Sequence, residues 1–229
     1  GIVVAVAAAA ILRLPPPPDG KLHVVFLPVG QGDSTLLVLP DGSAVLVDAG
    51  GDLRGTDVAK RRVLPWLRRR GIDRLAALAV SHLHPDHAGG VPDVLRALEV
   101  DELWTSGRPL TGPWGAPIAT AIAERGIPHR RLAAGDVLAR AGVRIEVLGP
   151  PDVEGSKDDP ALGDNDASLV LRLVHGDVAV LLPGDVEEIG ELALLESGAD
   201  LRADLLKAPH HGSRTSSTAA FVEAVGSAH

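Results

Sequence analysis

The chain of 229 residues contains no cysteine, and this absence limits its chemistry. Without thiols the chain can form no disulfide, no thiolate metal site and no cysteine nucleophile. Any metal ion must therefore be bound by histidine, aspartate or glutamate. Aromatic residues are also scarce, at 2% of the chain with no tyrosine. The core must be built from valine, leucine, isoleucine and alanine, which suits buried strands covered by helices.

Positive charge is in deficit, because 22 lysines and arginines stand against 30 acidic residues and leave a formal net charge of −8. This balance argues against a protein whose whole surface binds nucleic acid, but it does not exclude a local basic groove. Arginines gather at 61–70 and at 130–131. The favoured interpretation of both runs is a helix face exposed to solvent.

The apolar run at the start of the chain, GIVVAVAAAAIL at residues 1–12, is too short to span a bilayer as a helix. Arg13 and the four prolines at 15–18 follow it, and the prolines predict a stiff polyproline spacer. We interpret residues 1–20 as the end of a membrane helix with a linker, and residues 21–229 as the folded domain. A tag-derived or poorly ordered end is the alternative.

Short β-rich runs alternate with helical patterns in two batches, roughly 22–106 and 136–210. The predicted strands are 23–29, 34–39, 44–50, 75–80, 102–106, 143–149, 168–174, 177–184 and 204–209, and the predicted helices are 56–70, 91–98, 118–125, 187–196 and 217–225. This order predicts two packed sheets with helices outside, a four-layer αββα sandwich of the α/β (α+β) class. Residues 150–167 predict a long loop, and such loops are often functional.

A cluster of histidines follows the apolar run at 75–80. His82, His84 and His87 lie within six residues and share their segment with Asp86. Imidazole and carboxylate without sulfur suit Zn²⁺, Mn²⁺ or iron. Side chains this close in sequence diverge, so one tetrahedral ion cannot easily use all four ligands of this short run, and we expect two ions. A polar loop exposed to solvent is the alternative interpretation.

Polar residues also follow three other predicted strands. Asp48 ends AVLVD, Asp185 ends VAVLLPGD, and His210 and His211 follow DLLKAP. Polar groups that converge at the ends of several strands are typical of a functional site. For Asp185 alone, a cap at the start of the helix 187–196 is an alternative role.

These segments resemble a known family. LVDAG, SHLHPDHAGG, LPGD and PHHGS, in this order and spacing, are similar to the metal motifs of the metallo-β-lactamase superfamily. Within it, residues 22–225 are most similar to the C-terminal domain of the ComEC family, membrane channels for DNA uptake in natural transformation. The features that carry this likeness are FLPVGQGDS (26–34), NDASLVLRL (165–173), LLPGDVEE (181–188) and LLKAPHHGSRTSS (205–217).

The resemblance implies a metallo-β-lactamase sandwich with two divalent ions, Mn²⁺ or Zn²⁺, and no small organic cofactor. The implied ligands are His82 and His84 for one ion, Asp86, His87 and His210 for the other, and Asp185 between them. The resemblance also implies that Asp48 orients the metal-binding loop without binding metal. Asp86 and His211 are the implied catalytic residues: Asp86 positions the attacking water, and His211 stabilises phosphate charge or protonates the leaving oxygen. Either adjacent histidine can be the ligand, and His210 is preferred.

The chain departs from the superfamily pattern at the third histidine of the first ion. The corresponding segment, GDNDAS at 163–168, has no histidine. Asp164, Asn165 or Asp166 substitutes, or the site is weak. Oxygen ligands would favour Mn²⁺ over Zn²⁺.

The function expected from the resemblance is a metal-dependent phosphodiester hydrolase, a DNA nuclease that degrades the non-imported strand during natural transformation. Its expected partners are DNA, single-stranded or one strand of a duplex, and the membrane channel portion of the same full-length protein. The expected location is an extracytoplasmic soluble domain of a bacterial inner-membrane protein, with further strands after residue 229. Two alternatives stay open: a phosphorylcholine esterase or small phosphodiesterase of the same fold, and a non-catalytic DNA-binding domain with a degenerate metal site.

Two weaker features complete the sequence. Gly30 to Asp33 form a glycine-rich segment that lacks the lysine and hydroxyl residue of a phosphate-binding loop, so a tight turn is expected. Trp66, Trp104 and Trp114 are expected in core or edge packing rather than stacked on bases.

Overall fold

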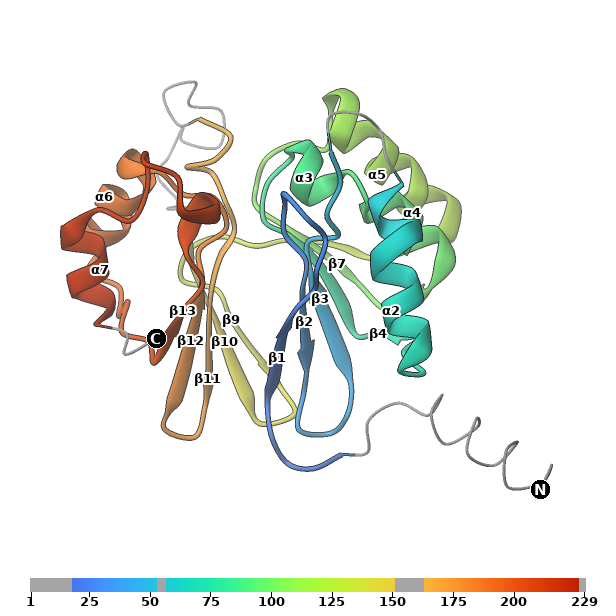
Figure 1. Ribbon diagram of the computed structural model, residues 1–229, viewed down its shortest axis with the longest axis horizontal. Coiled ribbons are helices and arrows are strands. Elements are labelled where there is room, and N and C mark those ends of the chain that lie inside the picture. The colour runs from blue at the N-terminus through green and yellow to red at the C-terminus, as the bar shows by residue number, and fades with distance from the viewer. Residues whose placement is uncertain (1–17, 53–56, 151–162, 227–229) are drawn as a thin grey trace.

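A computed structural model describes residues 18–52, 57–150 and 163–226, and within these ranges two sheets pack together with helices on their outer faces (Figure 1). The predicted αββα sandwich is therefore confirmed. The proposed membrane-helix end and linker at 1–20 lie, up to residue 17, outside the described residues. So do residues 151–162 of the predicted long loop. Within the described ranges no helix is long and apolar enough to cross a bilayer.

The first sheet has six strands in the order β1-β2-β3-β5-β7-β8. The strands are β1 (His23–Phe26), β2 (Thr35–Val38), β3 (Ala44–Val47), β5 (Ala77–Val80), β7 (Leu103–Thr105) and β8 (His129–Arg131). The first three pair antiparallel, and the pairs from β3 to β8 are parallel. The parallel strands β3, β5 and β7 therefore end at the same edge of the sheet.

The second sheet has five strands in the order β13-β12-β11-β10-β9. The strands are β9 (Val137–Arg140), β10 (Val143–Gly149), β11 (Val170–His175), β12 (Val178–Leu182) and β13 (Leu205–Leu206). Only β13 pairs parallel to its neighbour, so β12 and β13 also end side by side. A separate two-stranded sheet pairs β4 (Arg74–Leu75) with β6 (Glu99–Val100).

The helices form the two outer layers. On the outer face of the first sheet lie η1 (Ala59–Val63), α2 (Leu64–Arg69), α3 (Pro85–Ala88), α4 (Val91–Ala97) and α5 (Gly112–Arg125). The second sheet is covered by α6 (Glu188–Glu196) and α7 (Ala219–Val225), while η3 (Pro209–Gly212) follows β13 (Figure 1). The first predicted helix contains both η1 and α2, and the π-helical segment changes to α-helix at Leu64, next to Pro65.

Strand periodicity divides the apolar core. Successive side chains of a strand point to opposite faces, so Leu37 and Val45 join the cluster between the sheets. Their neighbours Leu36 and Leu46 join the cluster beneath the helices of the first sheet. A third cluster, which includes Phe221, fills the space between the second sheet and its helices. Burial on both faces explains why these strands read as continuous apolar runs.

Candidate metal centre

The predicted site residues lie at one end of the sandwich, where strands of both sheets terminate. Asp48 follows β3, and the segment His82–His87 follows β5. Asp185 follows β12, and His210 and His211 follow β13 within η3. In Figure 1, α3 and the segment after β13 face each other across this end. Residues more than a hundred positions apart are thus brought together by the shared direction of these strands.

Asp48 fixes the loop after β5. Its carboxylate accepts hydrogen bonds from the backbone N–H of Ser81 at 2.8 Å and from the Ser81 hydroxyl at 2.7 Å. It also lies 2.8 Å from Nδ1 of His87. The residue is buried and has a left-handed backbone conformation, with φ of 59°. This strained conformation directs the Asp48 side chain toward the loop. Because Nδ1 is engaged, Nε2 of His87 is the atom presented to the site.

Close backbone packing holds the same loop from the other side. Gly51 has φ of 147°, and a Cβ there would lie 2.0 Å from the backbone oxygen of Pro85. No larger residue fits without moving the loop. Pro85 itself occupies the first turn of α3, where its missing N–H costs nothing. The sequence therefore places Asp86 and His87 in that first turn with little freedom to shift.

His87 lies between two carboxylates. Its Nε2 is 3.1 Å from Oδ2 of Asp185, opposite the contact with Asp48. Burial alone would lower the pKa of His87, but the charge on Asp48 and the contact with Asp185 outweigh it and raise that pKa to about 10. In return, the charge on His87 holds the pKa of Asp48 below its ordinary value against the effect of burial. A metal ion that binds His87 must therefore displace a proton.

His211 also approaches the central carboxylate. Its Nε2 lies 3.3 Å from Oδ2 of Asp86 and 3.4 Å from Oδ2 of Asp185. The carboxylates of Asp185 and Asp86 raise the pKa of His211 to about 9. Burial would raise the pKa of Asp185, but its contacts with His211 and His87 hold it well below its usual range.

His210 is placed differently from His211. Its Nε2 is 4.0 Å from Asp185, while its Nδ1 lies 3.0 Å from Oε1 of Glu187. Both histidines have left-handed backbones, with φ of 45° and 52°, and consecutive strained residues of this kind are typical of functional sites. The assignment of His210 as the ligand stays a prediction, and in this geometry His211 lies nearer the cluster.

His82 and His84 occupy the other side of His87. The ring centroid of His82 lies 4.2 Å from that of His87 and 4.6 Å from that of His84. Burial, reinforced by the charge on His87, lowers the pKa of His82 to about 3, so this imidazole is neutral and ready to bind a metal. His84 lies at the rim, with Nε2 at 3.9 Å from Oδ2 of Asp164.

The three candidate substitutes for the missing histidine differ sharply in their surroundings. Oδ1 of Asp166 accepts the backbone N–H groups of Glu187 at 2.7 Å and Gly190 at 2.8 Å, so this residue caps α6. The capping role weighed for Asp185 therefore belongs to Asp166. Asp164 is partly engaged by Arg108, at 3.3 Å. Asn165 has a buried Oδ1 without a hydrogen-bond donor among the described residues.

Asp33 is a site residue that the sequence interpretation missed. Its Oδ1 lies 3.7 Å from Nδ1 of His211, and its carboxylate forms an ion pair with Lys207. Its backbone N–H donates to the oxygen of Asp86 at 3.1 Å. The glycine-rich segment is thus more than a turn. A signal was present in VGQGDS, because an acidic residue directly before a buried strand lies at the same sheet edge as Asp48.

The donor set fits a divalent cation. Ligand atoms of Asp33, His87, Asp185 and His211 all lie within 4.8 Å of one another. Nε2 of His82 and Oδ1 of Asp185 are buried and have no hydrogen-bond donor among the described residues. Leaving buried acceptors without donors is costly, and a cation would satisfy them. These donors fit divalent cations as a class, because oxygen and imidazole donors together suit Mn²⁺ as well as Zn²⁺.

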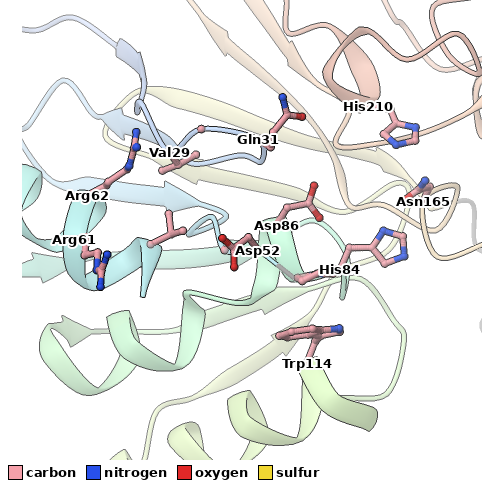
Figure 2. Close-up of a pocket in the computed structure, with 14 residues that line it drawn as sticks. Val29, Gln31, Asp52, Arg61, Arg62, His84, Asp86, Trp114, Asn165 and His210 are labelled. Carbon is pink, nitrogen blue, oxygen red and sulfur yellow. The ribbon is translucent and has the colours of Figure 1, made fainter. Parts of the chain in front are cut away.

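A groove of about 1080 Å³ opens beside this cluster (Figure 2). His84, Asp86, Asn165 and His210 line it and turn their polar atoms toward it. A substrate in the groove would therefore meet His84, Asp86 and His210, and Asp86 lies 3.3 Å from His211 of the metal-binding group. A groove of this size accommodates more than a single small group.

The chain belongs to the metallo-β-lactamase superfamily, whose family model matches residues 27–228. The match covers the described elements from β2 to α7. With the site described above, the fold and the family identify a hydrolase scaffold built to hold divalent metal ions.

More particularly, the chain is similar to competence proteins, as its motifs predicted. It is 30% identical over 213 residues to ComE operon protein 3 of Bacillus subtilis, a match that covers 88% of this chain and 27% of the relative. It is 33% identical over 196 residues to Recombination protein 2 of Haemophilus influenzae, which covers 86% and 22%. The chain thus spans about a quarter of the length of these relatives.

A solved structure supports the fold. The metallo-β-lactamase fold protein YhfI of Bacillus subtilis superposes with a TM-score of 0.51 at 13% identity, covering 95% of this chain and 80% of that chain. At this identity the likeness concerns the fold alone.

Proposed function

We propose that the domain is a metal-dependent nuclease that hydrolyses phosphodiester bonds of DNA. The observation that carries the proposal is a cluster of imidazoles and carboxylates with donorless buried acceptor atoms, open to a groove of about 1080 Å³. The similarity to competence proteins supports DNA as the substrate class. Its biological role would be degradation of the strand that is not imported during natural transformation.

Two bound divalent ions, of which oxygen-rich ligation favours Mn²⁺, would activate water and neutralise charge on the phosphate. Asp185, which is buried and has a lowered pKa, would provide ligand atoms to these ions. Asp86 lines the groove and would orient the attacking water. Nε2 of His82 and Oδ1 of Asn165 offer free acceptor atoms for the first ion.

The distances support a division of roles between the adjacent histidines that differs from the sequence prediction. His211 is 3.4 Å from Asp185 and belongs to the four-residue group that could hold an ion. His210 is 4.0 Å from Asp185 and lines the groove. We therefore assign metal binding to His211, and contact with the substrate phosphate or the leaving oxygen to His210.

The remaining expectations from the family likeness belong to the same proposal. The domain would act beside the membrane channel portion of the same full-length protein, on the extracytoplasmic side of a bacterial inner membrane. There the domain would bind DNA that arrives at the channel and would cleave one of its strands.

The test is cleavage of linear DNA by the purified chain with Mn²⁺, followed on denaturing gels. We expect cleavage by the wild type and none by His84→Ala or Asp185→Ala. Metal content, measured after gentle purification, should fall in His211→Ala and persist in His210→Ala, although both variants should lose activity. His175, which is partly exposed and contacts the backbone oxygens of Gly20 and Gly142, provides a matched histidine control.

Two results would overturn the nuclease proposal. Hydrolysis of chromogenic phosphodiesters without cleavage of DNA would select a small phosphodiesterase of the same fold. Intact DNA binding with metal content near zero would select a non-catalytic DNA-binding domain. Loss of metal in His210→Ala alone would reverse the roles assigned to the two histidines.

A further inference from the structure

The groove extends well beyond the metal-binding residues. Figure 2 places Arg61 and Arg62 at the end of the groove opposite His210 and Asn165, with Asp86 between the two ends. A ligand that occupied only the metal centre would leave the arginine end empty. The shape therefore accommodates a substrate that continues past the bond being cleaved.

The arginine end is equipped for negative charge. Neither Arg61 nor Arg62 forms an ion pair with a carboxylate of the described residues, and both are exposed on η1. Nη1 of Arg62 donates to the backbone oxygen of Pro28 at 2.8 Å, which holds the guanidinium at the groove without neutralising it. Asp52 also lines the groove, so two guanidinium groups stand against one carboxylate at this end. Guanidinium groups bind phosphate through paired hydrogen bonds.

An aromatic ring lies beside the other end. Trp114 lines the groove next to His84, and one side of it packs against the core beneath α5. Trp114 also lines a second hollow of about 380 Å³ with Arg108 and Asp164. Of the three tryptophans, Trp104 is fully buried and Trp66 lies under the guanidinium of Arg70 at 3.8 Å. Trp114 is thus the tryptophan placed to meet a ligand in the groove, and its partial burial against the core agrees with the expected edge packing.

We propose that this groove is a binding track for single-stranded DNA, in which Arg61 and Arg62 bind backbone phosphates away from the scissile bond and Trp114 stacks on a base beside it. The inference rests on the proposed nuclease function for its choice of polynucleotide. The phosphates of DNA repeat along its backbone. A strand bound at the metal centre therefore also carries phosphates that can reach the two guanidinium groups farther along the groove. Stacking on an indole requires an unpaired base, which favours a single strand over a duplex. The negative net charge of the whole chain is compatible with this binding track, because the track needs positive charge only at the end of the groove that carries Arg61 and Arg62.

The test is the affinity of a fluorescein-labelled oligothymidine for the chain, measured by anisotropy in Ca²⁺ with a gel to verify that the strand stays intact. Replacing Arg61 and Arg62 together with alanine should weaken binding about five-fold or more and reduce the salt slope by about 1.4, at ~0.7 per phosphate contact on a single strand. Arg68→Ala with Arg69→Ala removes the same charge from exposed positions of α2 outside the groove and should change neither quantity appreciably.

The tryptophan is tested by its own fluorescence. Oligothymidine should quench the wild-type emission, and Trp114→Leu should abolish the quenching and weaken binding about five- to hundred-fold. Equal salt slopes for the two arginine double variants would overturn the phosphate track. Quenching that persists in Trp114→Leu, or equal affinity for duplex and single strand, would overturn the stacking position. DNA binding with these properties but no cleavage under any divalent metal would instead refute the nuclease proposal and leave the track standing.

Discussion

Asp48→Asn isolates the residue that orients the metal-binding loop. Asparagine has the size of aspartate and tolerates the left-handed backbone at this position, where φ is 59°. Its amide oxygen can still accept from the N–H of Ser81, 2.8 Å away in the wild type. Its amide nitrogen cannot accept a hydrogen bond from Nδ1 of His87, now at 2.8 Å from a carboxylate oxygen. The variant therefore releases the ring of His87 while leaving the fold of the loop otherwise supported.

The Ser81 hydroxyl, which donates to the same carboxylate oxygen at 2.7 Å, can accept from the amide nitrogen instead, so the magnitude follows from the acceptor lost to His87. Removing the partner that orients a metal-binding histidine typically weakens metal affinity about 10- to 100-fold, or ~1.4 to 2.8 kcal/mol. We expect this loss for Mn²⁺ binding by Asp48→Asn, measured by isothermal titration. Asp204→Asn is the matched control, because Oδ2 of Asp204 accepts the N–H of Ala179 at 2.8 Å, at the start of β12 and far from the strand ends that form the site. Affinities for Asp48→Asn that equal those of the wild type and Asp204→Asn would refute the orienting role.

Four further outcomes are expected. Binding of Mn²⁺ at pH 7 should release about two protons per chain, seen as a buffer-dependent enthalpy, because His87 and His211 have pKa values of about 10 and 9 without metal; no proton release would contradict the charged pair. By the same shifts, both histidines stabilise the metal-free fold fully below pH ~6.5, and urea denaturation should show this stability disappearing as pH rises through about 9 to 10. Gly32→Ala should abolish metal binding, because its Cβ would lie 2.4 Å from a backbone oxygen of the metal-binding loop. Gly30→Ala is the matched control: alanine is strained there too, at φ of 97°, but its Cβ would meet no other atom, so metal binding should be retained. Glu191→Ala should lower the free energy of unfolding by roughly 2 to 5 kcal/mol, since the buried carboxylate accepts two backbone N–H groups before α7, and a loss below about 1 kcal/mol would show that those groups find other partners.

Much of the fold was predictable because apolar periodicity and turn residues act locally. The two batches of strands correspond to the two sheets. The strand His129–Arg131 was not predicted, because three polar residues at a sheet edge carry no apolar pattern. The helix predicted from 118 begins at Gly112 instead. Pro117 reads locally as a helix breaker, but packing of α5 against α4 retains it inside the helix.

The candidate site was predictable to the extent that residue type and strand position decide it. Histidines and aspartates after buried strands were predicted to meet, and the structure brings them together. Asp33 was not predicted, because the direction of its side chain depends on Lys207, 174 positions later in the chain, and on the backbone of the metal-binding loop. The different surroundings of His210 and His211 arise from two consecutive left-handed residues, a conformation that no sequence pattern specifies.

Anomalous diffraction from crystals soaked in MnCl₂, recorded on both sides of the manganese absorption edge, tests the metal centre most directly. One peak should lie within coordination distance of His87, Asp185 and His211, and a second should lie beside His82 and His84. Anomalous density absent from this end of the two sheets, in crystals that bind manganese elsewhere, would contradict a divalent metal site formed by these residues.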